Sequence, residues 1–110
     1  MAKRPPKKPS PRELRRKEER AQSALQADRE RLFALEPGGT AAHPLEVASA
    51  AVIEAHALAV PCPRCDGVHE LDEHAAVVRE GVRLREVRLR CRQCGTRRSL
   101  WFKLVPTTVN

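Results

Sequence analysis

The chain has 110 residues, a formal net charge of +7 at pH 7, and an aromatic content of one Trp, two Phe and no Tyr. This length holds one small domain, and a core so poor in aromatic side chains calls for an additional stabiliser such as a bound metal. The sequence has no uninterrupted apolar run of the kind found in a signal peptide or a membrane span. We therefore expect a protein of the reducing cytoplasm, in which Cys-x-x-Cys pairs are more often metal ligands than disulfides.

Charge is unevenly distributed along the chain. Residues 1–20 carry nine basic and three acidic side chains, residues 21–78 carry three and nine, and residues 79–110 carry nine and two. The two basic ends are therefore the expected interaction surfaces. Most of the basic residues are arginines, which suit bidentate contact with phosphate or carboxylate groups.

The N-terminal third predicts a disordered arm followed by a long helix. Residues 1–9 alternate Lys and Arg with Pro and have almost nothing to bury, so we expect disorder. A charged amphipathic helix is predicted over residues 10–36, with Ser10 as N-cap, Pro11 as first helical residue and Glu13 completing a capping box. Pro37-Gly38-Gly39 marks its end.

One stripe of this helix is apolar but is interrupted by Glu18 and Asp28. The stripe predicts that the helix docks on the rest of the domain. A coiled-coil dimer is the alternative, but it needs three or four clean heptads, which this stretch lacks, so a monomer is favoured. The docking side chains would be Leu25, Leu32, Phe33 and Leu35.

Residues 37–56 are predicted to be a linker followed by an Ala-rich segment. Leu45–Glu54 fits either a helix or a strand, because its apolar residues satisfy a helical period while its β-branched residues suit a strand. For Ala55–Val60 we expect extended structure running into the first cysteine turn.

The rest of the chain has a β pattern. Val68–Val78 and Val82–Arg90 are predicted to form a hairpin that turns at Gly81, and Ser99–Val105 a last strand before a frayed tail at 106–110. In the second strand the alternation of apolar and basic residues slips at Glu86. Such a slip predicts a β-bulge.

Four cysteines carry the clearest chemistry in the sequence. They form two pairs, Cys62-Pro-Arg-Cys65 and Cys91-Arg-Gln-Cys94, separated by 25 residues. A hairpin of this length brings the two turns face to face, and four thiolates give the tetrahedral site that a structural Zn²⁺ ion prefers. Rubredoxin-like iron and a redox-active dithiol are the alternatives, which a basic chain with two matched pairs makes less favourable.

Together the two cysteine turns and the strands around them resemble the zinc-ribbon family over residues 57–105. The resemblance implies an antiparallel zinc-ribbon sheet. Together with the N-terminal helix predicted above, this gives a small α+β fold. Ribbon turns commonly place Gly after the second cysteine, as Gly95 does here. Asp66 takes that place in the first turn and also tolerates a left-handed backbone. Arg64 and Arg92 are expected to offset the negative charge of the metal centre.

Catalysis has no support in the sequence. A catalytic zinc keeps an open coordination position, whereas four cysteines close the tetrahedron. His69 and His74, which fall between the pairs, are therefore expected on the strand surface rather than at the metal. No phosphate-binding loop or nucleophile motif accompanies them, so we expect a protein that binds rather than catalyses.

Arginines alternate along the strand that enters the second turn and continue beyond it. On an exposed sheet face they would follow a phosphate backbone of DNA or RNA, assisted by the basic arm and by base stacking on Trp101. A protein adaptor that docks an acidic partner through the helix and the ribbon is the alternative. The candidate nucleic-acid contacts are Arg83, Arg85, Arg88, Arg90, Arg92, Arg97, Arg98 and Trp101.

Overall fold

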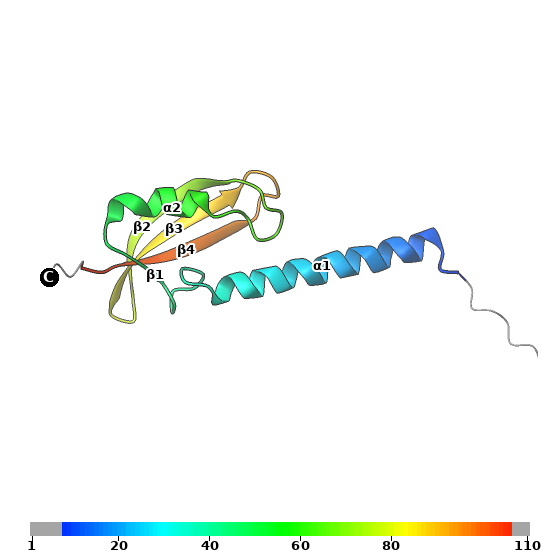
Figure 1. The fold of residues 1–110 in the computed structure, drawn as a ribbon, viewed down its shortest axis with the longest axis horizontal. Coiled ribbons are helices and arrows are strands. Elements are labelled where there is room, and N and C mark those ends of the chain that lie inside the picture. Colours follow the sequence, from blue (N-terminus) through cyan, green and yellow to red (C-terminus); the bar gives the residue numbers. More distant parts are fainter. Residues whose placement is uncertain (1–7, 107–110) are drawn as a thin grey trace, which may run out of the picture.

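The computed structural model describes residues 8–106, which form one long helix, one short helix and a four-stranded mixed sheet (Figure 1). Most of the predicted basic arm and of the predicted tail lies outside the described residues. Neither described helix is both long enough and apolar enough to span a bilayer. The elements are α1 (Pro11–Leu35), β1 (Leu45–Val47), a 3₁₀ turn (Ala50–Val52), α2 (Ile53–Ala59), β2 (His69–Arg79), β3 (Val82–Cys91) and β4 (Arg97–Leu104).

Helix α1 begins with the capping box that the sequence predicts. The Glu13 backbone N–H donates to Ser10 Oγ at 3.2 Å, and the Ser10 N–H donates to the Glu13 carboxylate at 3.4 Å. Both groups would otherwise be unpaired at the helix start, and Pro11 has no N–H to satisfy. The last turn closes as the Glu36 N–H donates to the Phe33 carbonyl.

The predicted docking of α1 through its leucines is wrong. Leu25, Leu32 and Leu35 are 53%, 64% and 74% exposed, and among the four predicted docking residues it is Phe33 that packs against the core. Figure 1 shows α1 extending well beyond the sheet. The helix meets the domain through a polar face instead, which leaves the leucine stripe turned away.

The sheet has strand order β1-β4-β3-β2. β2 and β3 form the predicted antiparallel hairpin, with Gly81 at φ 79°, and β4 pairs antiparallel to β3. β1 pairs parallel to β4 in a register that sets Leu45 beside Phe102, so the expectation of a purely antiparallel sheet is wrong. This edge strand adds Leu45 and Val47 to the core.

Of residues 55–60, which were expected to be extended, residues 55–59 belong to α2 and only Val60 has an extended backbone. Ile53 and Ala57 lie one helical turn apart and are both fully buried. Burial of this pair on the sheet, together with the helix propensity of alanine, outweighs the short β-like alternation. The core beneath α2 consists of Val87, Leu89, Leu100 and Phe102.

Strand β3 is regular, so the bulge predicted at Glu86 is wrong. The extra residue lies in β2, where the register shifts between Leu71 and Glu73. Side chains of β3 therefore alternate strictly, with Val87 and Leu89 toward α2 and Leu84 and Glu86 on the opposite side, here called the open face. Leu84 is only 4% exposed. The slip in the sequence pattern thus records a change in which face is buried, not an inserted residue.

Candidate metal centre

The structure brings the four cysteines together at one end of the sheet. Their sulfur atoms all lie within 4.8 Å of one another. Cys62 and Cys94 Sγ are 3.7 Å apart, and Cys65 and Cys91 Sγ are 3.3 Å apart. Sulfurs of a tetrahedral zinc site are about 3.8 Å apart when each Zn–S bond is about 2.3 Å. The cluster is therefore positioned to bind a metal ion of this kind, and all four thiols are free of disulfides.

The two cysteine turns share one backbone pattern. In the first, the Asp66 N–H donates to the Cys62 carbonyl at 2.8 Å; in the second, the Gly95 N–H donates to the Cys91 carbonyl at 3.0 Å. Each turn then needs a left-handed residue after its second cysteine, and Asp66 and Gly95 have φ values of 61° and 76°. The predicted equivalence of these two residues is confirmed.

Gly67 allows the two turns to approach each other. A Cβ at this position would lie 2.8 Å from Cys91 Sγ and 3.1 Å from Cys65 Sγ. Both distances are too short for non-bonded atoms. Position 67 therefore requires a glycine, because the first turn here lies against the Cys91 sulfur of the second turn.

Hydrogen bonds and burial give three of the thiols different pKa values. The Thr96 hydroxyl, 3.1 Å from Cys94 Sγ, and the Thr96 backbone lower the pKa of Cys94 to about 6. Backbone N–H groups of Cys94 and Gln93 donate to Cys91 Sγ and, led by that of Cys94, lower the Cys91 pKa. Burial, followed by the contact with Cys91, raises the pKa of Cys65 to about 12. Two thiolates are thus stabilised by the second turn, whereas the Cys65 thiol releases its proton to solvent only when a cation binds the sulfur.

The arginine beside the sulfurs is Arg98, not the predicted Arg64 or Arg92. Its guanidinium donates to Cys62 Sγ at 3.6 Å. Arg64 donates to Gln26 of α1 at 3.3 Å instead. The Arg92 guanidinium lies 3.5 Å from a Glu70 carboxylate oxygen.

Both histidines stand apart from the cysteine cluster. His69 is only 2% exposed, so its predicted place on the strand surface is wrong. Its Nδ1 lies 2.8 Å from the Val60 carbonyl, which fixes the proton on that nitrogen and ties the end of α2 to β2. His74 Nδ1 lies 3.0 Å from Glu54 and makes a second link between the same two elements.

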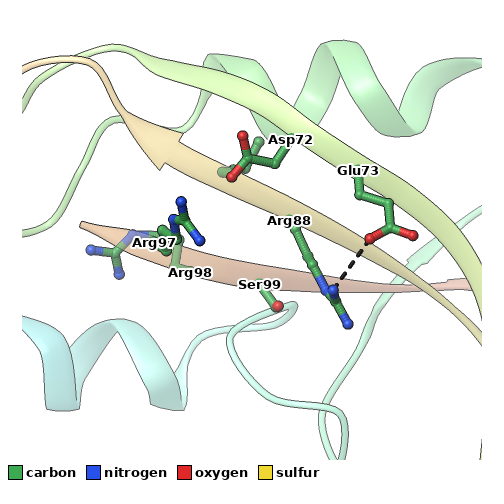
Figure 2. Close-up of a pocket in the computed structure, with 7 residues that line it drawn as sticks. Asp72, Glu73, Arg88, Arg97, Arg98 and Ser99 are labelled. Carbon is green, nitrogen blue, oxygen red and sulfur yellow. Dashed lines mark hydrogen bonds and ion pairs between the residues drawn. The ribbon is translucent and has the colours of Figure 1, made fainter. Parts of the chain in front are cut away.

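The end of the sheet that carries the cysteine cluster is here called the metal end. On its open face, carboxylates accompany the predicted row of arginines. Glu70 and Glu73 of β2 sit directly across from Arg90 and Arg88 in the sheet register. Arg90 Nε donates to Glu70 at 2.8 Å and Arg88 donates to Glu73 at 3.2 Å. Figure 2 shows the Arg88–Glu73 pair beside the arginines of β4. Glu73 and Glu70 therefore largely neutralise Arg88 and Arg90.

A hollow of about 360 Å³ lies at this place, lined by both acidic and basic groups. Arg97 lines it and has no carboxylate partner within 4 Å among residues 8–106. Asp72, displaced by the β2 bulge, lines the opposite side (Figure 2). Beneath Arg88, the Ser99 hydroxyl donates to Glu86 at 2.6 Å and so satisfies a carboxylate that is only 7% exposed.

The hairpin end of the same sheet has a different charge balance. The Arg79 guanidinium lies 5.5 Å from the centre of the Trp101 ring, in a cation–π arrangement. Lys103 lies on the same face of the sheet as Trp101, whereas the side chains of Arg83 and Arg85 project from the opposite face. No carboxylate lies within ion-pair distance of these four cations in the part of the chain that the structure describes.

The predicted nucleic-acid residues thus fall into three groups. Arg83, Arg85 and Trp101 lie at the hairpin end, and Arg97 stands unpaired near the metal. Arg79 and Lys103 were not among the predicted residues, although the alternation of side chains along β2 and β4 could have placed both of them on the sheet face of Trp101. The residues held in carboxylate pairs are Arg88, Arg90, Arg92 and Arg98.

No protein-family model, curated protein or solved structure matches the chain. The assignment of the site therefore depends on its own geometry. That geometry consists of a four-sulfur cluster on matched turns, one arginine beside it, and two sheet ends of different charge.

Proposed function

We propose that the protein is a zinc ribbon in which Cys62, Cys65, Cys91 and Cys94 hold a structural Zn²⁺ ion. Sulfur separations close to those of a tetrahedral S₄ site support zinc, as does the glycine that the sulfurs demand at position 67. Four thiolates leave no position for a catalytic water. The ion's chemistry here is therefore to cross-link the two turns, and the function is binding.

The ligand we propose is nucleic acid, bound at the hairpin end of the sheet. The observation that carries this proposal is a set of four cations without carboxylate partners among the described residues: Arg79 and Lys103 on the face of Trp101, and Arg83 and Arg85 on the opposite face. A phosphate that approaches a paired arginine has to displace a carboxylate, whereas one that approaches Arg83 or Arg85 does not. Unpaired cations therefore contribute more to phosphate binding than the paired arginines at the metal end.

The shape of the hairpin end suits an extended strand of nucleic acid. Two hollows of about 530 and 510 Å³ flank the hairpin. The first is lined by Arg83 and Arg85, and the second by Arg79 and Lys103 together with Glu80, which forms no ion pair with them. Trp101, in contact with Arg79, lies on the same face of the sheet as Arg79 and Lys103 and offers an aromatic surface on which a base can stack. Single-stranded DNA or RNA exposes both the phosphates and the base faces that this surface requires.

Salt-dependent binding of a fluorescent oligonucleotide tests the proposal. Replacing Arg83 and Arg85 with Gln removes two phosphate contacts, so the slope of log K against log salt should fall by roughly 0.7 per contact. The matched control is Arg88→Gln with Arg90→Gln, which changes the net charge equally. It should alter affinity much less, because those arginines face Glu73 and Glu70. Equal losses in the two double variants would refute the hairpin-end site.

A protein adaptor is the second candidate, favoured by the exposed leucine stripe of α1. Leu25 and Leu32 are more than half exposed and lie one heptad apart, a spacing that suits a partner helix. In this case one acidic protein should co-purify with the chain. Leu25→Gln with Leu32→Gln should abolish that co-purification without changing the helical signal.

A further inference from the structure

Helix α1 rests on the metal end through polar contacts along one face. The face consists of residues 26, 29 and 30, and each of them reaches a residue of the first cysteine turn or of β4. The pairs are Gln26 with Arg64 at 3.3 Å, Arg29 with Asp66 at 3.9 Å, and Glu30 with Arg98 at 2.7 and 2.9 Å. With the leucine stripe exposed, these pairs and Phe33 are what fix the helix against the domain.

Arg98 is the centre of this contact. Its side chain is only 7% exposed and binds both carboxylate oxygens of Glu30. The same guanidinium donates to Cys62 Sγ and lies 5.3 Å from the centre of the Phe33 ring. One buried cation thus joins a carboxylate and an aromatic ring of α1 to a sulfur of the metal site.

A buried arginine needs compensating negative charge from its surroundings. Glu30 supplies one charge, and Arg98 in turn lowers the pKa of Glu30 through their hydrogen bonds. The second source is Cys62, whose sulfur is permanently a thiolate when four cysteines share one divalent ion. That centre carries a net charge of −2, so a positively charged N–H donor stabilises its thiolates.

We propose that the docking of α1 and the binding of the metal stabilise each other through Glu30 and Arg98. The ion holds the first cysteine turn and the Cys62 thiolate in the positions that receive α1. The docked helix, in return, holds Arg98 against the thiolate. By thermodynamic reciprocity, anything that releases the helix weakens metal binding by the same factor that metal loss weakens docking. Arg98 is here a positioning residue and does not bind the ion.

The proposal rests on the metal site proposed above and is separable from it. Competition with a chromophoric chelator measures the zinc affinity of the full chain and of its variants. Failure of the unmodified chain to bind zinc would overturn the metal site itself. Normal zinc binding, with affinity unchanged by helix variants, would overturn the coupling alone.

Glu30→Gln is the deciding variant, because Glu30 touches no ligand sulfur among the described contacts and lies on a stable exposed helix. Its zinc affinity should fall about fivefold or more, the lower range for coupled sites. Arg98→Gln should lose about tenfold or more, as second-shell donors do. The matched control is Asp28→Asn, which breaks the exposed Asp28–Arg31 pair of the same helix and should leave zinc affinity unchanged.

Two further readouts separate coupling from a general loss of stability. The double variant Glu30→Gln/Arg98→Gln should bind zinc no more weakly than Arg98→Gln alone, because both changes remove one interaction. In the zinc-loaded protein, Glu30→Gln should raise amide hydrogen exchange over residues 26–34 while leaving β3 protected. Additive losses, or equal exchange changes in helix and sheet, would overturn the proposal.

Discussion

The two ends of the β2–β3 hairpin differ in how their charges are used. At the metal end, Arg88 and Arg90 face Glu73 and Glu70, and the turns are held by a cluster of four sulfurs. At the hairpin end, Arg79 and Lys103 on the face of Trp101, and Arg83 and Arg85 on the opposite face, have no carboxylate partners in the described chain. This difference is the basis of our proposal that one end of the sheet stabilises the fold and the other end binds a ligand. Four predictions test this difference, from the largest effect to the smallest.

Removal of the metal should affect the fold most. Structural zinc contributes roughly 10–16 kcal/mol of apparent binding free energy in zinc-finger peptides at neutral pH, and here the core is small. We expect strong chelation, or Cys91→Ser, to abolish the sheet signal in circular dichroism at both ends, because β3 joins them. A spectrum that is unchanged by chelation would mean that the hydrophobic core holds the sheet without help from the metal end.

Two glycine substitutions, one at each end of the sheet, should differ in their effect on zinc affinity. Gly67→Ala places a Cβ 2.8 Å from Cys91 Sγ, so zinc affinity should fall about tenfold or more in chelator competition. Gly81→Ala meets no atom within 4 Å and only strains a backbone with φ 79°, which costs about 1–2 kcal/mol of unfolding free energy. Its zinc affinity should stay unchanged. Similar metal affinities for the two variants would show that the sulfurs tolerate a wider separation.

The pH dependence of zinc binding should reflect the unequal thiols. Cys65, whose pKa is raised to about 12, remains protonated at pH 7 without metal, whereas Cys94, with a pKa of about 6, is mostly ionised. Zinc must therefore displace at least one proton, and affinity should fall as pH falls, by about tenfold per unit for each proton displaced. Calorimetric titrations in buffers of different ionisation enthalpy count these protons. A count of zero at pH 7 would contradict the assigned order of acidity.

The smallest expected effect comes from unmasking the arginines of the metal end. Glu70→Gln with Glu73→Gln removes the carboxylate partners of Arg90 and Arg92 and leaves Arg88 only its contact with Glu86. It should change the unfolding free energy by less than about 1 kcal/mol because the lost pairs are largely exposed. Oligonucleotide affinity at low salt should rise several-fold as the metal end acquires the character of the hairpin end. No rise would indicate that position on the sheet, rather than carboxylate pairing, decides which arginines bind.

Local features of the fold could be predicted from the sequence, because their causes lie within a few residues. The Ser10 capping box, the Gly81 turn and the left-handed Asp66 each depend on neighbouring backbone groups alone. The pairing of two Cys-x-x-Cys turns follows from ligand chemistry. The structure brings those sulfurs within reach of one ion, as that chemistry requires.

Features that depend on distant contacts could not be predicted in this way. The parallel pairing of β1 with β4 and the helical form of residues 53–59 both depend on packing in the core, of Leu45 in the first case and of Ile53 in the second. The one-residue shift in β2 decides which carboxylate faces Arg88, because it sets Glu73 there in place of Asp72. The apolar pattern of β3 placed that irregularity on the wrong strand, because Leu84 is buried on a different face from Val87.

The two matched turns are nevertheless unequal in their access to solvent. Cys62 and Cys91 are 0% and 1% exposed, whereas Cys94 is exposed beside Thr96. An incoming chelator, oxidant or metal-accepting protein therefore reaches the sulfur of Cys94 before the others. All four ligands would contribute to the affinity of the site for an ion, but the rate of ion exchange would be set at Cys94.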